Sequence, residues 1–272
     1  MSPSPRTRMA PPWLQKNKIS FNSDSISGKY RSIAPIMWKE IISVFRKDNL
    51  YQQAFEEACE MLDTDGKMFE ASVESLRQLD TAEIKVDIYA LDKEINRSER
   101  DVRKKVMKHL LLSGDQQLPS GLALVSVVID IERIGDYTKN IFDLARRHPK
   151  RLLAGSIEEK LQEIEKDTSS VFRKTIQAFR DGDEKLAREA MEEYKVEVST
   201  DCEKMVDDLI AGEVEGLEGP EFAAVVLYLR YLKRIGSHSR NIASSIVNPF
   251  HRIGYREKKE DGHETDIVPP AE

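Results

Sequence analysis

The feature that most limits how this chain can fold is a segment that occurs twice, 101 residues apart. The first copy begins at Pro119 and the second at Pro220, and more than twenty residues then stay in register without a gap. The chain is therefore predicted to be a tandem duplication of a unit of about a hundred residues. Residues that match at this offset include Val125 and Val226, Arg133-Ile134-Gly135 and Arg234-Ile235-Gly236, and Asn140-Ile141 and Asn241-Ile242.

The distribution of proline indicates that the duplicated unit is helical. Only three of the 11 prolines, Pro119, Pro149 and Pro220, lie between residues 36 and 248. A proline inside a helix costs about 3 kcal/mol, so prolines collect where helices begin or end. Apolar residues recur at helical spacing between these prolines. The pattern predicts an all-α fold and disfavours a β-sandwich or an alternating α/β fold.

Caps, glycines and prolines predict three helices in each copy of the repeat. The second of these helices is expected to begin at Thr81, which can serve as its N-cap. Long antiparallel helices joined by short turns are typical of bundles, so we expect two tandem three-helix bundles with irregular N- and C-terminal tails. The expected helices are 38–78, 81–113, 119–148, 156–182, 183–211 and 219–247; the expected regions are a basic, Pro/Ser-rich N-terminal arm at 1–37, repeats at 38–150 and 151–248, and a C-terminal tail at 249–272.

The third and sixth helices are predicted to form the centre of the molecule. Their first halves are apolar all round, which is typical of buried helices, so we expect them to pack against each other. Gly135 and Gly236 lie in the middle of these helices, where glycine costs about 1 kcal/mol relative to alanine. Close approach of a neighbouring helix would offset that cost in both copies.

Composition and charge exclude several classes of protein. Cys59 and Cys202 stand alone, so they form neither a disulfide framework nor a zinc site. No apolar stretch approaches the ~20 residues of a membrane span, and no N-terminal segment resembles a signal peptide, so we expect a cytoplasmic protein. Residues 1–37 carry a net charge of +5 and the rest of the chain −11. An acidic body disfavours nucleic acid as the main partner.

The basic arm allows more than one interpretation. It can be a solvated tail, or it can contact an acidic partner or an anionic membrane surface. Its apolar side chains can fold onto a partner, or they can wrap back onto the bundle of the same chain. These side chains are Trp13, Leu14, Ile19 and Phe21.

Two carboxylates of the third helix form the main candidate site. Glu132 and Asp136 are four residues apart and therefore lie on one helix face, where like charges repel unless a cation lies between them. That cation can belong to the chain itself, with Arg133, Arg230, Lys233 and Arg234 as candidates. It can also be a metal ion held by acids on facing helices. The residues alone leave both alternatives open.

The segment Asp130–Ile141, DIERIGDYTKNI, resembles the signature of PhoU-domain proteins. The second copy, Leu232–Ile242, is similar to a degenerate version of it, and Asp87–Glu99 is similar to another stretch of the family. The resemblance extends over about residues 38–255. It implies two three-helix bundles in tandem and a role in phosphate homeostasis. PhoU-like proteins restrain the phosphate-starvation two-component response, communicating between a phosphate transporter and a membrane sensor histidine kinase.

The resemblance also implies a metal centre. Several PhoU-like proteins bind iron, zinc or similar divalent ions through paired E/D-x-x-x-D motifs. Carried over by position, one motif is Glu132-x3-Asp136, and Asp92-x3-Asn96 would face it from the second helix. The identity of the metal stays open.

The second repeat departs from this pattern. At the offset of 101, Lys233 and Ser237 replace the two acids, so the metal site is expected to be lost there. Glu193 and Glu197 remain on the partner helix, where a salt bridge with Lys233 explains them better than a metal does. His238 could supply a ligand, but a histidine between helices is the simpler interpretation.

We expect a non-enzymatic regulator that acts by protein–protein contact. The chain has no nucleophile elbow, P-loop, HExxH or dinucleotide-binding fingerprint. One alternative is a metal-free structural adaptor of a membrane transporter. A carboxylate-bridged metal enzyme is disfavoured because neither Glu132 nor Glu193 has a histidine three residues later. The expected partners are the transporter or kinase, with a homo-oligomer possible and membrane contact only through the partner.

Overall fold

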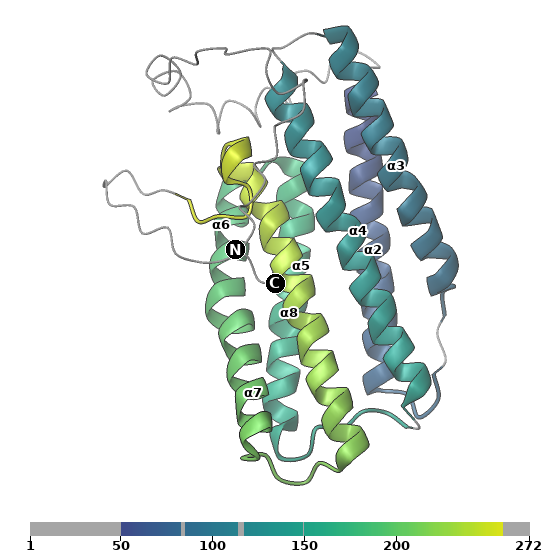
Figure 1. Ribbon diagram of the computed structural model, residues 1–272, viewed down its shortest axis with the longest axis vertical. Helices are drawn as coiled ribbons and strands as arrows, with labels where there is room; N and C mark the ends of the chain where they lie inside the picture. The colour runs from purple at the N-terminus through teal and green to yellow at the C-terminus, as the bar shows by residue number, and fades with distance from the viewer. Residues whose placement is uncertain (1–49, 83–84, 114–116, 149, 258–272) are drawn as a thin grey trace, which may run out of the picture. The chain divides into compact units, whose positions relative to one another are not determined.

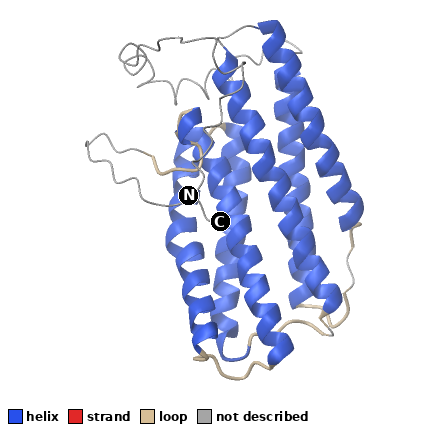
Figure 2. Ribbon diagram, in the orientation of Figure 1, coloured by secondary structure: helices blue, strands red, loops and turns tan. Residues whose placement is uncertain are grey.

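The computed structural model describes residues 50–82, 85–113, 117–148 and 150–257. All of them belong to the second of two contact-defined units of the chain, Ala34–Glu272. The predicted N-terminal arm, the first part of the first helix and the end of the C-terminal tail lie outside the described residues. Within the described ranges the regular elements are helices, and no strand is present (Figure 2).

The prediction of two tandem three-helix bundles is confirmed (Figure 1). The first repeat consists of α2 (Leu50–Arg77), α3 (Ile88–Ser113) and α4 (Leu118–Arg147). In the second repeat the middle helix has three parts that follow one another without a break. Its elements are η4 (Gly155–Ile157), α5 (Glu158–Asp181), α6 (Glu184–Glu193), the π-helical segment η5 (Tyr194–Ser199), α7 (Thr200–Ala211) and α8 (Gly219–Val247), with the short 3₁₀ turn η6 (Phe250–Arg252) after it.

The duplication is visible in the pattern of buried residues. Every buried position of α4 from Ala123 to Ala145 has a buried counterpart in α8, 101 residues later. Most buried positions of α2 also have a buried counterpart in α5, but at an offset of 103: Phe69 of α2 corresponds to Phe172 of α5. A single offset therefore does not relate all equivalent helices of the two repeats.

The two repeats pack through equivalent helices. The central helices α4 and α8 lie against each other, as the sequence predicts (Figure 1). The first helices α2 and α5 also meet, through ring contacts between Phe69 and Phe172 at 6.2 Å and between Phe55 and Phe179 at 5.2 Å. These contacts join the two bundles into one core.

A buried arginine fastens the first repeat to the second. Arg77, at the end of α2, places its guanidinium 2.5 Å from Glu158 and 2.6 Å from Glu165, both on α5. The same group donates a hydrogen bond to the carbonyl of Leu152 in the connecting segment. Its side chain is only 5% exposed. One side chain thus links α2, the connection and α5.

The two mid-helix glycines make room for side chains of the neighbouring helices. A Cβ atom at Gly135 would lie 2.8 Å from Oδ1 of Asp65 on α2 and 3.3 Å from Cδ1 of Ile95 on α3. At Gly236 it would lie 2.7 Å from the ring of Tyr194. Contacts this short mean that a methyl group would fit only if the neighbouring side chains moved. Close packing is therefore the reason for glycine at both positions.

Two predicted details of the helices are wrong. The second helix begins at Ile88, because the carboxylate of Asp87 accepts a hydrogen bond from the amide of Ala90 at 3.0 Å and caps it. Thr81 lies in irregular backbone before that point. The fifth helix, predicted to be regular, contains the π-helical segment η5. Periodicity at 3.6 residues per turn gives no signal for such a local widening.

Candidate metal centre

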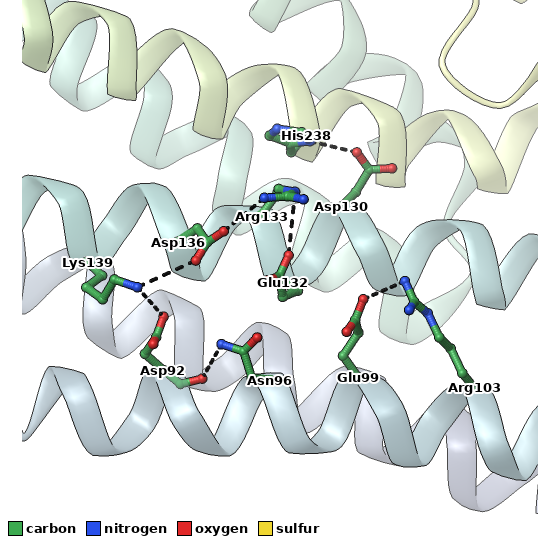
Figure 3. A network of polar contacts seen from close by, with 10 residues as sticks. All are labelled: Asp92, Asn96, Glu99, Arg103, Asp130, Glu132, Arg133, Asp136, Lys139 and His238. Carbon is green, nitrogen blue, oxygen red and sulfur yellow. Dashed lines mark hydrogen bonds and ion pairs between the residues drawn. The ribbon is translucent and has the colours of Figure 1, made fainter.

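The predicted site is an acidic cluster between α3 and α4, formed by Asp92, Glu132 and Asp136 (Figure 3). Asp92 comes from α3, and the other two residues lie one turn apart on α4. The side chains of Asp92 and Glu132 are 14% and 13% exposed, so both are largely withdrawn from solvent. Burial and the nearby charge of Asp136 raise the pKa of Glu132, although Arg133 opposes this effect.

Two basic side chains of α4 neutralise the acidic cluster (Figure 3). The ammonium of Lys139 lies 3.1 Å from Asp92 and 3.6 Å from Asp136, so it bridges the two helices. Arg133 lies 3.1 Å from Asp136 and 3.6 Å from Glu132. Burial alone would lower the pKa of Lys139, but its hydrogen bond with Asp92 and the charges of Asp92 and Asp136 outweigh it and raise the pKa. The predicted role of Arg133 is therefore observed, while Lys139 was not among the candidate cations.

Asn96 takes a different role from that predicted for a ligand. Its side-chain amide donates a hydrogen bond to the carbonyl of Asp92 in its own helix, at 2.9 Å. Among the described residues, no three His, Cys, Asp or Glu side chains lie close enough together to hold a metal ion. In this arrangement the cations that contact the acidic cluster are Lys139 and Arg133.

Sequence reasoning missed a fourth acid, Asp65 on α2. Its side chain is fully buried, and neither carboxyl oxygen has a hydrogen-bond partner. Oδ1 faces α4 at Gly135, the residue next to Asp136. The spacing of the core gives a signal that could have found it, because Asp65 follows the buried Leu62 by three residues and precedes the buried Phe69 by four.

Asp65 is unfavourable for the fold as it stands. An unpaired carboxylate in a protein interior costs several kcal/mol, and a neutral carboxyl still loses hydrogen bonds to water. Burial, together with the charges of Glu132, Asp92 and Asp136, raises the pKa of Asp65 well above its usual range. A group of this kind is retained where function needs it or where the core tolerates it.

The second repeat contains ion pairs in place of an acidic cluster. Lys233 pairs with Glu203 rather than with Glu193 or Glu197, so the predicted partner is wrong. Glu193 instead lies 2.6 Å from Lys174 on α5. The prediction assumed that the middle helices are offset by 101 residues. At this level the offset is 103, because Ile95 lies against Gly135 and Val198 lies against the equivalent Gly236.

Three residues predicted as the second-repeat equivalents of the metal ligands do not form a common site. Glu197 is exposed within η5, and Ser237 is partly exposed on α8. His238 points to α4, where its Nδ1 lies 2.7 Å from Oδ1 of Asp130 (Figure 3). The ring of Tyr137 stacks on His238 at 5.7 Å and also contacts Tyr231 at 6.2 Å. His238 is therefore a contact between the repeats.

The fold and the repeated motif define a class of tandem three-helix-bundle proteins, and comparison with known families gives that class a name. The model of the PhoU domain matches residues 58–145 and, a second time, residues 161–246. The two matches cover more than half of the chain and coincide with its two repeats. The chain belongs to the PhoU domain family.

Two curated relatives are each named as a phosphate-specific transport system accessory protein PhoU homolog. The one from Pseudomonas putida is 27% identical over 165 residues, which are 58% of this chain and 62% of the relative. The one from Pseudomonas aeruginosa is 26% identical over 184 residues, or 63% and 74%. The chain therefore spans less than two thirds of the length of the first relative.

Two solved structures share the fold. The crystal structure of PhoU from Pseudomonas aeruginosa superimposes with a TM-score of 0.61 at 21% identity, covering 73% of this chain and 95% of that one. The phosphate transport system regulatory protein PhoU from Streptococcus pneumoniae gives 0.60 at 19% identity, covering 73% and 91%. In the described part of the chain, no helix is long and apolar enough to cross a membrane.

Proposed function

We propose that the chain is a cytoplasmic, non-enzymatic regulator of phosphate uptake and phosphate-starvation signalling. The observation that carries this proposal is the match of both repeats to the PhoU domain. The names of the curated relatives, which are accessory proteins of phosphate-specific transport systems, support it. The regulator acts by protein–protein contact with a phosphate transporter, a membrane sensor histidine kinase, or both. Its contact with the membrane is indirect, through that partner.

We further propose a carboxylate-bound metal centre in the first repeat. Glu132 and Asp136 of α4 would hold the ion, with Asp92 and Asn96 of α3 facing them. The buried, unpartnered carboxyl of Asp65 next to these residues supports a cation here. Iron, zinc or a similar divalent ion would supply positive charge to these acids of α3 and α4. This donor set consists of oxygen ligands, which suit hard cations.

A metal-free structural adaptor is the second candidate function. The ion pairs of Lys139 and Arg133 favour it, because they already neutralise the acidic cluster without a metal. The two candidates differ in their response to a chelator. Ligand binding to the native state stabilises a protein, so a metal-bearing regulator loses thermal stability when stripped. The adaptor keeps both its stability and its partner binding.

Matched variants test the metal centre. Glu132→Gln/Asp136→Asn removes the charges of the first repeat, and Glu193→Gln/Glu197→Gln removes two acids of the second. The untagged full chain is purified and its metal content measured by mass spectrometry. Loss of bound metal in the first variant alone supports the centre. Equal metal content in the wild type and both variants contradicts it.

Partner recovery tests the regulatory role. The full chain is crosslinked in cells grown with ample or limiting phosphate, and the bound proteins are identified. Recovery of a phosphate transporter subunit or a sensor histidine kinase, with a yield that depends on phosphate, supports the proposal. Recovery of neither protein under either condition contradicts it. Removing residues 1–36 in the same experiment shows whether the N-terminal arm serves partner binding or the stability of the bundle.

A further inference from the structure

The outer face of α3 carries a row of basic side chains. This helix packs on α2 and α4 through its opposite face, which buries Ile95, Val102 and Val106 (Figure 1). Residues three or four positions apart lie on one face of a helix. Exposed bases follow one another at this spacing along the outer face, and we call them the basic line. They are Lys93, Arg97, Arg100, Lys104 and Lys108.

Contacts within the chain do not explain the basic line. None of its side chains forms an ion pair within the described ranges, whereas Arg103 and Lys105, on its flanks, pair with Glu99 and Glu57. Like charges at this spacing repel each other and destabilise a helix. The chain has 48 acidic and 42 basic residues, so a run of one sign does not follow from its composition. A contact outside the chain that offsets the repulsion is the simplest reason for it.

The basic line ends in exposed apolar side chains. Near the C-terminal end of α3, Met107 is 58% exposed, Leu111 79% and Leu112 82%. Met107 and Leu111 follow Lys104 by three and seven residues, so they continue the line on the same helix face. Neighbouring exposed apolar side chains of this size indicate an interaction site. The outer face of α3 therefore combines positive charge with an apolar end.

The second repeat shows that the fold does not require bases on this face. At the offset of 103 that holds for the middle helices, the central residues of the basic line correspond to Thr200, Glu203 and Asp207 of α7. The same positions are therefore neutral or acidic in the second copy. A second molecule of this chain is nevertheless a poor partner for the basic line, because Glu203 is already paired with Lys233.

We propose that the outer face of α3 is the docking surface for an acidic amphipathic helix of a partner protein. The inference rests on the regulatory function proposed above, which acts by protein–protein contact, and specifies the surface and the chemistry of that contact. Acids of the partner helix pair with the basic line, and its apolar side chains pack on Met107 and Leu111. The alternating spacing of three and four residues from Lys93 to Leu111 is that of a seam between two helices.

The distribution of charge favours a narrow partner. Residues 1–37 carry a net charge of +5 and the whole chain −6, so the remainder of the chain carries −11. A partner helix that lies along α3 meets the basic line alone. An anionic membrane or a nucleic acid is broader and also faces the acidic remainder, which repels it. The basic line thus suits a protein helix better than either of these surfaces.

Site-specific photo-crosslinking of the full chain in cells tests the docking surface. Met107 is replaced by the photoreactive residue p-benzoylphenylalanine, which leaves the basic line intact. The control carries the same residue at Ile210, the equivalent position of the second repeat, which is 72% exposed. After irradiation, the crosslinked peptides are sequenced by mass spectrometry. We expect position 107, but not position 210, to label an acidic helical segment of a phosphate transporter subunit or a sensor histidine kinase.

Charge reversal shows whether the basic line holds that segment. Arg97→Glu/Arg100→Glu/Lys104→Glu reverses its centre, and we expect the yield of the adduct at position 107 to fall at least about tenfold, because like charges then face each other. The matched control reverses three exposed lysines of the second repeat and should keep the yield. It is Lys185→Glu/Lys195→Glu/Lys204→Glu. Thermal melting checks folding, and glutamine replaces glutamate if a variant unfolds.

The outcomes separate the docking surface from the proposed function. An adduct at position 107 with lipid, nucleic acid or a second copy of the chain overturns the proposal, and so does an adduct whose yield is unchanged by charge reversal of the basic line. If general crosslinking recovers the transporter subunit or the kinase but position 107 labels neither, only the docking surface is overturned. If neither experiment recovers such a partner, the regulatory function and the docking surface fail together.

Discussion

At the scale of single residues, the sequence predicts the acidic cluster between α3 and α4 and misses Asp65, the buried acid on α2. The family motif identifies Glu132 and Asp136, and the structure brings Asp92 next to them. Lys139 could not be foreseen, because its reach to α3 depends on a side-chain conformation that no spacing rule contains. Asp65 was within reach, since a charged residue at a core position breaks an otherwise apolar stripe.

Two helical glycines should respond to alanine in opposite directions. At Gly135 the new methyl group would meet Asp65 at 2.8 Å, so we expect Gly135→Ala to destabilise the fold by about 1–3 kcal/mol. At Gly66 its nearest neighbour is Cδ1 of Ile176 at 3.6 Å, an ordinary contact, so Gly66→Ala should stabilise by about 1 kcal/mol. Urea unfolding of both variants measures the difference. Equal effects would contradict the packing described for Gly135.

At the scale of elements, the type and order of the helices are predictable, whereas their ends depend on local competition. Apolar periodicity identifies the helices because each buries one face against the others. Pro119 and Gly212 mark ends correctly, since proline suits a first turn and Gly212 has the positive φ of a helix end. The prediction of Thr81 as the N-cap of α3 is wrong because Asp87 lies closer to the packed part of this helix and caps it.

The N-cap of α3 offers a direct test. Asp87→Ala removes the acceptor of the Ala90 amide, and we expect a loss of about 1 kcal/mol in the free energy of unfolding. Thr81→Ala is the matched control and should have no measurable effect. A larger loss in the control than in Asp87→Ala would restore Thr81 as the start of the helix.

The Arg77 contacts between α2 and α5 should matter far more than a surface ion pair. Arg77→Met leaves Glu158 and Glu165 without their buried counter-ion, and we expect a cost of about 3 kcal/mol or more. Lys185→Met breaks an exposed pair with Glu189 within one helix and should cost at most about 0.3–0.5 kcal/mol. Chemical denaturation of both variants compares them. Similar losses would show that Arg77 does not join the repeats.

Glu158 should make the same contacts sensitive to acid. Burial alone would raise its pKa, but hydrogen bonds from Ala154, Arg77 and Gln162 outweigh burial and lower the pKa. A lowered folded-state pKa gives stability that is present above the unfolded-state pKa of about 4.3 and lost as the pH falls through the folded value. Glu158→Gln should therefore be less stable than the wild type at pH 7, and the gap should close below about pH 4. A gap that is constant with pH would contradict this role.

At the scale of the whole molecule, the duplication determines both the fold and the limits of its prediction. One offset of 101 residues was enough to predict two bundles and the pairing of α4 with α8. The same offset failed for the other helices, where it misplaced Glu193 and Glu197. The first helices and the level of Ile95 and Val198 share an offset of 103, so the difference of two residues arises between that level and the central helices.

The shared core predicts that both repeats unfold together. Because α4 packs on α8 and Phe69 on Phe172, neither bundle can open without exposing the other. We expect one calorimetric transition whose calorimetric and van't Hoff enthalpies agree. Phe172→Ala should lower this single transition, at a cost of about 3–5 kcal/mol, without splitting it. Two separate transitions in the wild type would contradict a common core.

The contacts of Asp130 and Tyr137 with α8 make the two ends of the α4–α8 interface different from each other. Asp130 corresponds to Tyr231 and Tyr137 to His238, so the same two positions meet twice, once as Asp130 with His238 and once as Tyr137 with Tyr231. If the two repeats had identical sequences, these two contacts would be chemically identical. In this chain one contact is polar and the other is aromatic. The two ends of the α4–α8 interface therefore differ chemically, so a molecule bound along these helices would have one preferred orientation.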